Sequence, residues 1–295
     1  MTVSTALRLR QICLLAYDLE WTSGMLSAAF DAPVVFRDPR MAAGGDLTNT
    51  HIRLGDTFLE TVSPSDHAWA KSTTQTRLLE RNGDCGYMAI VQVPDVALAS
   101  QTMSVQGSGT GIVAGSWNIC DGEPGSGLAG VKSGPYELGT PLTKQPDTVS
   151  GINVQFHPRD FGTLAEIQEN WPGQDSFPQN KGTYYPAGNT WQNDVDSRPH
   201  GGVTTGFAAV EIACRDIDPA EICLRWVNGL GAGCSLVHDD PTALQLADFQ
   251  TMRFVESRDG RTGVIGVDLW EAPGRRKFDS LEICGVKWRT VPYPV

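Results

Sequence analysis

The sequence predicts an α+β protein built from repeated modules, each consisting of a strand, a helix and three further strands. Three segments share one pattern: an apolar strand that ends in Asp, followed by an amphipathic stretch. Short runs of strand character follow each of them. The unit is present two full times, a third time less clearly and a fourth time cut short. The three segments are RQICLLAYDLEWTSGMLSAAF (10–30), YMAIVQVPDVALASQTMSVQ (87–106) and AAVEIACRDIDPAEICLRWV (208–227).

An aspartate closes each of these three opening strands, at Asp18, Asp95 and Asp216. A carboxylate at this point accepts the exposed backbone N–H groups of the first helical turn. We therefore expect all three aspartates to be helix N-caps.

The runs that follow predict the remaining strands of each module. In the first module they are 33–38, 50–55 and 57–62; in the second, 111–119, 152–158 and 163–168; in the third, 234–238, 244–248 and 249–257. The fourth start is a strand at 263–273, followed by a short helix near 277–285 and a last strand at 286–291.

The stretch HIRLGDTFLETV (51–62) predicts a hairpin, because polar and apolar residues alternate on both sides of Gly55-Asp56. With these two residues as the turn, Ile52 opposes Leu59 on a core face. On the other face His51 opposes Glu60, so a histidine and a carboxylate lie at cross-strand contact distance.

A segment rich in Pro, Gly and Asn interrupts the modules at 171–202, which its composition marks as a linker. We therefore divide the chain into an N-terminal domain of two modules (1–170), the linker (171–202) and a C-terminal domain (203–295) with one full and one partial module.

Composition limits the class of function. The chain has 295 residues, 23 of them basic and 34 acidic, for a formal net charge of −11. Such a surface argues against nucleic acid or an anionic membrane as partner. The seven cysteines form no CxxC pair, which argues against a disulfide framework or a zinc knuckle. Without a signal peptide or an apolar run long enough to cross a bilayer, we expect a cytoplasmic location.

Three motifs, in this order and spacing, resemble the vicinal oxygen chelate superfamily, specifically its glyoxalase-like members. The opening strand carries Gln11 seven residues before Asp18; LGDTFLETVSP (54–64) is similar to the LGDxxLELxxP strand pair; and HPRDFGTLAEI (157–167) resembles the HPKDxGGVLVEL ending of methylmalonyl-CoA epimerases. The resemblance implies tandem modules forming paired, curled mixed β-sheets with helices outside, the glyoxalase/bleomycin-resistance/dioxygenase-like fold.

The resemblance also implies a divalent metal on the floor of a cleft, held by the first and last strands of each module. Carried over by position, the metal ligands are Gln11, Glu60 and Glu166. The fourth position holds Met88, a thioether that a hard cation does not choose. The metal would be zinc, nickel, manganese, cobalt or iron, with waters or His51 as further ligand; the alternative is a cleft without metal.

The two glutamates are the strongest candidates, because both stand in apolar strands where an unpaired buried carboxylate is costly. The structural alternative is a salt bridge to an arginine such as Arg53, which otherwise matches an anionic substrate group. We assign Glu166 and His51 to catalysis as proton carriers. The residues predicted to bind substrate are Arg53, Phe58, Met88, Trp117 and His157.

Two functions follow from the resemblance. The first is a lyase, isomerase or epimerase acting on a small oxygenated substrate through a divalent metal that stabilises an enolate. The second is a metal-free protein that sequesters a small aromatic or toxic compound. An extradiol dioxygenase is disfavoured, because the opening-strand positions hold Gln11, Met88 and Ala209 and no histidine. We expect a monomer or a homodimer.

Overall fold

The protein forms two mixed β-sheets in a computed structural model that describes residues 7–38, 46–107, 112–120, 131–135, 151–170, 202–275 and 278–294. The nine strands of sheet A are, in spatial order, β2 (Val34–Asp38), β3 (Leu47–Leu54), β4 (Thr57–Pro64), β1 (Arg8–Leu15), β5 (Cys85–Gln92), β9 (Leu164–Asn170), β8 (Gly151–Phe156), β6 (Ile112–Cys120) and β7 (Val131–Pro135). The seven strands of sheet B are β11 (Ser235–Val237), β12 (Asp240–Gln245), β13 (Thr251–Glu256), β10 (Thr204–Cys214), β14 (Gly263–Glu271), β16 (Val286–Val291) and β15 (Leu281–Ile283).

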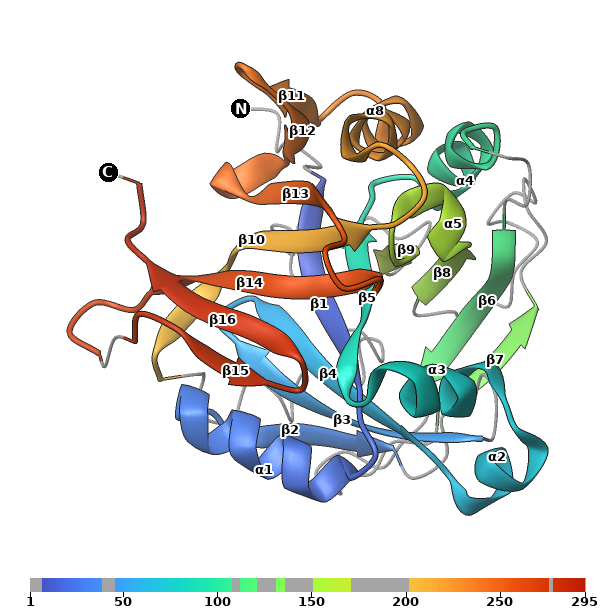
Figure 1. The fold of residues 1–295 in the computed structure, drawn as a ribbon, viewed down its shortest axis with the longest axis vertical. Helices are drawn as coiled ribbons and strands as arrows, with labels where there is room; N and C mark the ends of the chain where they lie inside the picture. The colour runs from blue at the N-terminus through green and yellow to red at the C-terminus, as the bar shows by residue number, and fades with distance from the viewer. Residues whose placement is uncertain are drawn as a thin grey trace.

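Helices connect and cover the sheets (Figure 1). They are α1 (Leu19–Phe30), α2 (Asp66–Lys71), α3 (Thr74–Asn82), α4 (Val96–Ser104), α5 (Pro158–Phe161) and α8 (Pro219–Leu230), with a 3-10 turn, η3, at Ala247–Phe249. Helix α8 packs against α4 and α5, whereas α1 packs against β3, β4 and β15. In the described part of the chain no helix has the length and apolar character needed to cross a bilayer.

Both sheets use one connection rule. The first strand of a module pairs parallel with its last strand, as β1 does with β4, and antiparallel with the first strand of the next module, as β1 does with β5. In sheet B, β10 pairs in the same way with β13 and β14. The predicted α+β class, with curled mixed sheets and helices outside, is confirmed.

A single apolar core joins the two sheets. It contains Leu59 and Ile12 from sheet A together with Val210 and Trp288 from sheet B. The sheets approach closely where β5 passes β14: a Cβ on Gly86 would lie 2.1 Å from the carbonyl oxygen of Val264, so only glycine fits there. The six cysteines whose side chains are described are all free.

Two of the three predicted N-caps are confirmed. The carboxylate of Asp18 accepts from the backbone N–H of Trp21, and that of Asp95 accepts from Leu98. The third prediction was wrong: α8 is capped by Asp218, two residues after Asp216. Pro219 explains the difference, because a proline favours the first helical position, immediately after the cap.

The short helix predicted near 277–285 is also wrong, because the described part of that segment holds strand β15. Ile283 pairs directly with Val286, and the two residues between them, Cys284 and Gly285, have φ angles of 56° and 64°. Two consecutive positive φ angles make a two-residue hairpin turn of type I′, which sends the chain back along the sheet. The sequence reasoning also missed α2, α3 and β7.

The hairpin predicted around Gly55-Asp56 is confirmed in its register. Leu54 pairs with Thr57, Ile52 with Leu59, and His51 with Glu60. Ile52 and Leu59 enter the core, so the alternation of the sequence places His51 and Glu60 on the opposite face.

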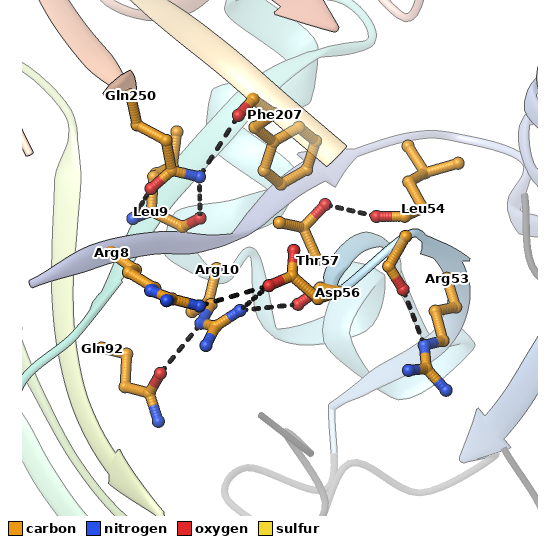
Figure 2. A network of polar contacts seen from close by, with 11 residues as sticks. Arg8, Leu9, Arg10, Arg53, Leu54, Asp56, Thr57, Gln92, Phe207 and Gln250 are labelled. Atoms are coloured by element: carbon orange, nitrogen blue, oxygen red, sulfur yellow. Dashed lines mark hydrogen bonds and ion pairs between the residues drawn. The ribbon is translucent and has the colours of Figure 1, made fainter. Parts of the chain in front are cut away.

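Gln250 ties the opening strands of the two halves together (Figure 2). Its Oε1 accepts from the backbone N–H of Leu9 at 2.8 Å, and its Nε2 donates to the carbonyl oxygens of Leu9 at 3.0 Å and Phe207 at 3.2 Å. The side chain is buried, so these backbone groups have no access to bulk water.

We expect Gln250→Ala to lower the free energy of unfolding by about 2–4 kcal/mol, because it leaves buried backbone groups of Leu9 and Phe207 without partners. Urea denaturation of the full chain measures this loss. Gln245→Ala, at a half-buried position on the neighbouring β12, is the control and should cost about 0.5 kcal/mol or less. If the two variants lost the same free energy of unfolding, Gln250 would not be a specific link between the two opening strands.

Candidate functional site

Polar side chains gather on the face of sheet A that is turned away from the main core, here called the site face. Gln11 lies on β1, Glu60 on β4 and Glu166 on β9, all on this face because their sequence neighbours point into the core. Each of the three is at most 5% exposed. The two halves of the sheet therefore bring both glutamates into a buried polar layer.

Three side chains hold Glu60. Gln11 donates from Nε2 to one carboxylate oxygen at 2.7 Å, and Asn49 donates from Nδ2 to the other at 2.6 Å. The Nε2 atom of His51 lies 3.3 Å from that second oxygen. His51 stacks on Phe36, with ring centroids 5.1 Å apart, which fixes the imidazole plane beside the carboxylate.

Glu166 is held by amides alone. Gln155 donates from Nε2 at 2.8 Å, and Asn153 lies at 3.5 Å from the same oxygen. Ser116 orients Asn153 through a hydrogen bond of 2.6 Å. In the described part of the chain, neither Glu166 nor Glu60 has a lysine or arginine in ion-pair contact.

The two clusters correspond by strand position. Gln155 pairs across from Glu166 just as His51 pairs across from Glu60, and an asparagine lies two residues earlier in each case. The decisive difference is His51 against Gln155, because an imidazole can carry a positive charge and an amide cannot.

This difference separates the acidities of the two glutamates. Burial by itself raises the pKa of both carboxyls. For Glu166, burial and the negative charge of Glu60 outweigh its amide hydrogen bonds and raise the pKa from 4.5 to about 7. For Glu60, the hydrogen bond and charge of His51, with help from Asn49 and Cys13, outweigh burial and leave the pKa below its ordinary value.

An apolar cluster borders the carboxylates on the site face. Cys13, Met88, Ile90 and Leu164 form a buried cluster with Leu79 of α3. Burial, then the charges of both glutamates, raises the pKa of the Cys13 thiol. The site face thus combines carboxylates and amides with an apolar surround, as expected of a small-molecule site.

The structure places the other predicted residues as follows. Arg53 donates from Nε to the carbonyl oxygen of Gly55 at 2.8 Å (Figure 2), and Phe58 is buried beside His51, with ring centroids 6.4 Å apart. His157 caps α5, its Nδ1 accepting from the backbone N–H of Arg159. Trp117 lies in β6, but its side chain is outside the described residues.

Sequence reasoning missed the amides that hold the two carboxylates. The signal was present as N-x-H at 49–51 and N-x-Q at 153–155, because residues two apart on a strand share a face. It also missed the network at the start of β1, where Arg10 donates to Gln92 and to Asp56 (Figure 2).

The fold is shared with solved proteins. A hypothetical protein from Staphylococcus aureus matches 97% of this chain with 99% of its own length, at a TM-score of 0.60 and 9% identity. A substituted variant of 4-hydroxymandelate synthase from Streptomyces coelicolor matches 90% of this chain with 71% of its own, at a TM-score of 0.51 and 11% identity. Methylmalonyl-CoA epimerase from Mycobacterium tuberculosis matches 56% of this chain with 88% of its own, at a TM-score of 0.36 and 14% identity.

The chain has the fold of the vicinal oxygen chelate superfamily. No protein-family model matches the sequence, and no protein of curated function is similar to it in sequence. The assignment therefore depends on three-dimensional similarity, and it establishes the fold of the superfamily without a reaction.

A divalent cation of the kind this superfamily implies fits the oxygen donors of the site face. No group of three or more His, Cys, Asp or Glu side chains in the described residues is arranged to hold a metal. Amide oxygens, however, are also ligands of hard cations. Asn49 Oδ1 is buried beside Glu60 and has no hydrogen-bond partner among the described residues. That oxygen, with the carboxylates of Glu60 and Glu166, gives a donor set of the right chemistry.

The fourth position implied by the superfamily holds a residue that does not suit a hard cation. Met88 pairs with Leu164 on β9 as Gln11 pairs with Phe58 on β4, so Met88 and Gln11 are equivalent within their modules. A thioether sulfur is a soft donor. Met88 is therefore not suited to be a ligand of a hard cation.

Glu166→Gln should flatten the pH dependence of stability. Because the folded protein raises the pKa of Glu166 from 4.5 to about 7, its contribution to stability is fully present below pH 4.5 and is lost as pH rises to about 7. The stability of the wild type relative to the variant should fall by about 3 kcal/mol over this range. Urea denaturation at several pH values measures it.

The exposed Glu80→Gln, on α3, serves as the control and should leave the wild-type slope unchanged. A Glu166→Gln protein with the same pH slope as the wild type would show that Glu166 ionises normally.

Proposed function

We propose that the chain is an enzyme, a lyase, isomerase or epimerase, that moves a proton beside a carbonyl group of a small oxygenated substrate bound at the site face of sheet A. The separation in acidity between Glu60 and Glu166 carries this proposal. Two carboxyls whose environments push their pKa values apart are typical of acid–base sites. The fold is compatible with such an enzyme, and the proposal depends on the environments of these two glutamates.

Glu166 has the properties of the general base. A pKa of about 7 leaves a substantial fraction of both protonation states near neutral pH, so the carboxylate can accept a proton from carbon and return it. Gln155 and Asn153 donate to one oxygen, Oε2. The described contacts leave the other oxygen, Oε1, to face a substrate.

Glu60 remains ionised and keeps its neighbours in position. Its carboxylate fixes the amide of Gln11 and the ring of His51, which lie on two different strands. We propose His51 as the second proton carrier, because its imidazole lies 3.3 Å from Glu60 in the same polar layer and an imidazole can both accept and donate a proton.

We further propose that Glu60 and Glu166 hold a divalent metal, with Gln11 and Asn49 as oxygen donors. When bound, such an ion supplies Lewis-acid stabilisation of negative charge on a substrate oxygen. Among the described residues, neither carboxylate has a lysine or arginine in ion-pair contact that could take this part. Arg53 and Phe58, at the turn end of the hairpin, are proposed to contact the substrate.

One observation favours the alternative of a metal-free binding protein. Met88, together with Ile90 and Leu164, gives the site face an apolar patch where a ligand side chain was expected. Such a surface suits a small aromatic compound that is bound but not chemically converted. Metal content and proton exchange separate the two functions.

Purified protein is expected to contain a stoichiometric divalent metal, measured by elemental analysis after dialysis. Glu60→Ala and Glu166→Ala should each lose it, because each removes a charged oxygen donor and affinity depends on ligand charge. Glu169→Gln is the matched control: its carboxylate accepts from the backbone N–H of Val96 and lies away from the cluster. Metal-free protein that gains none on addition of manganese, cobalt, nickel or zinc would leave the binding protein as the function.

Exchange of carbon-bound hydrogen for deuterium tests the reaction without knowledge of the product. NMR in D₂O should show exchange beside the carbonyl in some members of a panel of α-hydroxy ketones and 1,3-dicarbonyl compounds. Glu166→Gln should slow it about 10²–10⁴-fold, as loss of a general base does. In protein freed of metal, any exchange should become faster as the pH rises through about 7, because Glu166 then ionises. Exchange that survives in Glu166→Gln would exclude this residue as the base.

A further inference from the structure

Sheet B repeats the architecture of the site face with its charges inverted. The β-bulges fix the correspondence: the β1–β5 ladder shifts register before Gln11 and after Cys13, and the β10–β14 ladder shifts before Ala209 and after Glu211. Gln11 therefore corresponds to Ala209, and Cys13 to Glu211. Gln250 supports this match, because it bonds to Leu9 and Phe207, which lie just before the register shifts that precede Gln11 and Ala209.

The positions of the two glutamates follow from the pairing. Cys13 pairs with Glu60, and its counterpart Glu211 pairs with Arg253. On the other side, Glu166 pairs with Ile90 on β5.

The corresponding pair in sheet B is Arg289 with Asp268 on β14. Both glutamate positions of sheet A are thus arginines in sheet B.

These arginines converge on one carboxylate. Arg253 donates from Nη2 to Oδ2 of Asp268, and Arg289 donates from Nε to Oδ1, both at 2.5 Å. Glu211 lies 3.9 Å from Nε of Arg253 and 3.8 Å from Nη2 of Arg289, within ion-pair range but beyond a hydrogen bond. Asp268 holds both guanidinium groups, and the side chains of Arg253 and Arg289 are 33% and 28% exposed.

The residues that lie beneath the two arginines have small side chains or none. Ala209 replaces Gln11, and Gly266 occupies the position that corresponds to Met88. A Cβ on Gly266 would meet Nη2 of Arg289 at 3.3 Å, so the glycine lets this guanidinium lie against the backbone of β14. Nη2 is buried there and has no hydrogen-bond partner among the described residues.

A carboxylate oxygen of Glu211 lies 3.8 Å from this nitrogen, so the ion pair leaves its N–H groups without a hydrogen bond. A buried N–H group without a partner costs free energy, and native proteins rarely leave one unsatisfied. Each guanidinium has five N–H donors, of which Asp268 engages one on each arginine. Arg253, Arg289, Asp268 and Glu211, here called the quartet, have charges that sum to zero. The charges of Lys287 and Glu282, nearby on β16 and β15, also cancel. This face therefore has no excess charge. Its distinctive feature is the set of arginine N–H groups that Asp268 does not engage.

Aromatic rings border the quartet. Trp270 lies two residues beyond Asp268 on β14, hence on the same face. Tyr293 packs edge-on against it with ring centroids 5.1 Å apart, and Phe249 packs on Tyr293 at 6.2 Å. Tyr293 and Phe249 are 50% and 55% exposed. An open aromatic border of this kind suits a flat apolar ligand.

We propose that this face of sheet B is a second binding site, which takes a small aromatic carboxylate. The carboxylate would accept from N–H groups of Arg253 and Arg289 that Asp268 does not engage, in the forked geometry that arginine favours. The ring would lie against Trp270 and Tyr293. This site is separate from the site face of sheet A and does not depend on the reaction proposed there.

Fluorine NMR of 4-fluorobenzoate with the full chain tests the site, with 4-fluorobenzamide as the neutral probe. We expect the acid to bind with a Kd of about 1 mM or tighter and the amide to bind at least tenfold more weakly. Arg289→Lys keeps the charge and the pairing with Asp268 but loses the fork, so affinity should fall about tenfold. Arg261→Lys, an exposed arginine paired with Asp259, is the control and should bind as the wild type does.

Gly266→Ala provides an independent variant, because it crowds Nη2 of Arg289 without changing any charge. It too should weaken binding of 4-fluorobenzoate, while the melting temperature shows that the chain is folded. No binding of the acid to the wild type, or equal binding in the wild type and both variants, would overturn the proposal and leave the quartet as an ionic lock within sheet B.

Discussion

The structure depends on the pairing of each opening strand with two neighbours, one parallel and one antiparallel. This pairing fixes which residues of distant segments meet, because a strand shifted by one residue would turn all its side chains to the other face. Glu60 reaches the site face because Leu59 and Val62 are committed to apolar clusters on either side of the sheet. The register of β4 on β1 therefore positions the polar chemistry as much as it stabilises the core.

The two halves of sheet A differ chemically at one position, which is His51 in the first half and Gln155 in the second. Both glutamates are buried to the same degree and each accepts hydrogen bonds from amides. Only Glu60 has an imidazole across the strand pair. A buried carboxylate beside a group that can be positive stays ionised, whereas Glu166, beside Gln155 and within the field of Glu60, is easily protonated. Near-symmetric repeats thus give two carboxyls with different roles.

Sheet B uses the same backbone for a different electrostatic solution. Arginines at the two glutamate positions neutralise Asp268 and Glu211, so this face is internally paired where the site face is not. Asp268 is buried, but both arginines and Glu211 are partly exposed, and ion pairs in that setting stabilise a fold only modestly. What they provide is a rigid arrangement of donors over a floor of small residues.

Some parts of this arrangement were readable in the sequence and some were not. The hairpin register, the caps at Asp18 and Asp95 and the burial of Glu60 and Glu166 follow from alternation and from local hydrogen bonding, which depend on residues close in the chain. The cap of α8 was misplaced because two aspartates compete within three residues. The strand at 281–283 was mistaken for a helix because its turn requires positive φ angles at Cys284 and Gly285.

By itself the sequence determined the module, its repetition and the polar face of the first hairpin, because each of these depends on a short-range period. Only the tertiary structure decided that amides hold Glu166, and that Arg253 and Arg289 meet at Asp268. The contacts of Asp268 with Arg253 and Arg289 join residues 15 and 21 positions apart, and the first of them joins two modules. The register of the sheet sets their distances. The chemistry of both faces is therefore a product of strand pairing, which local residue patterns do not contain.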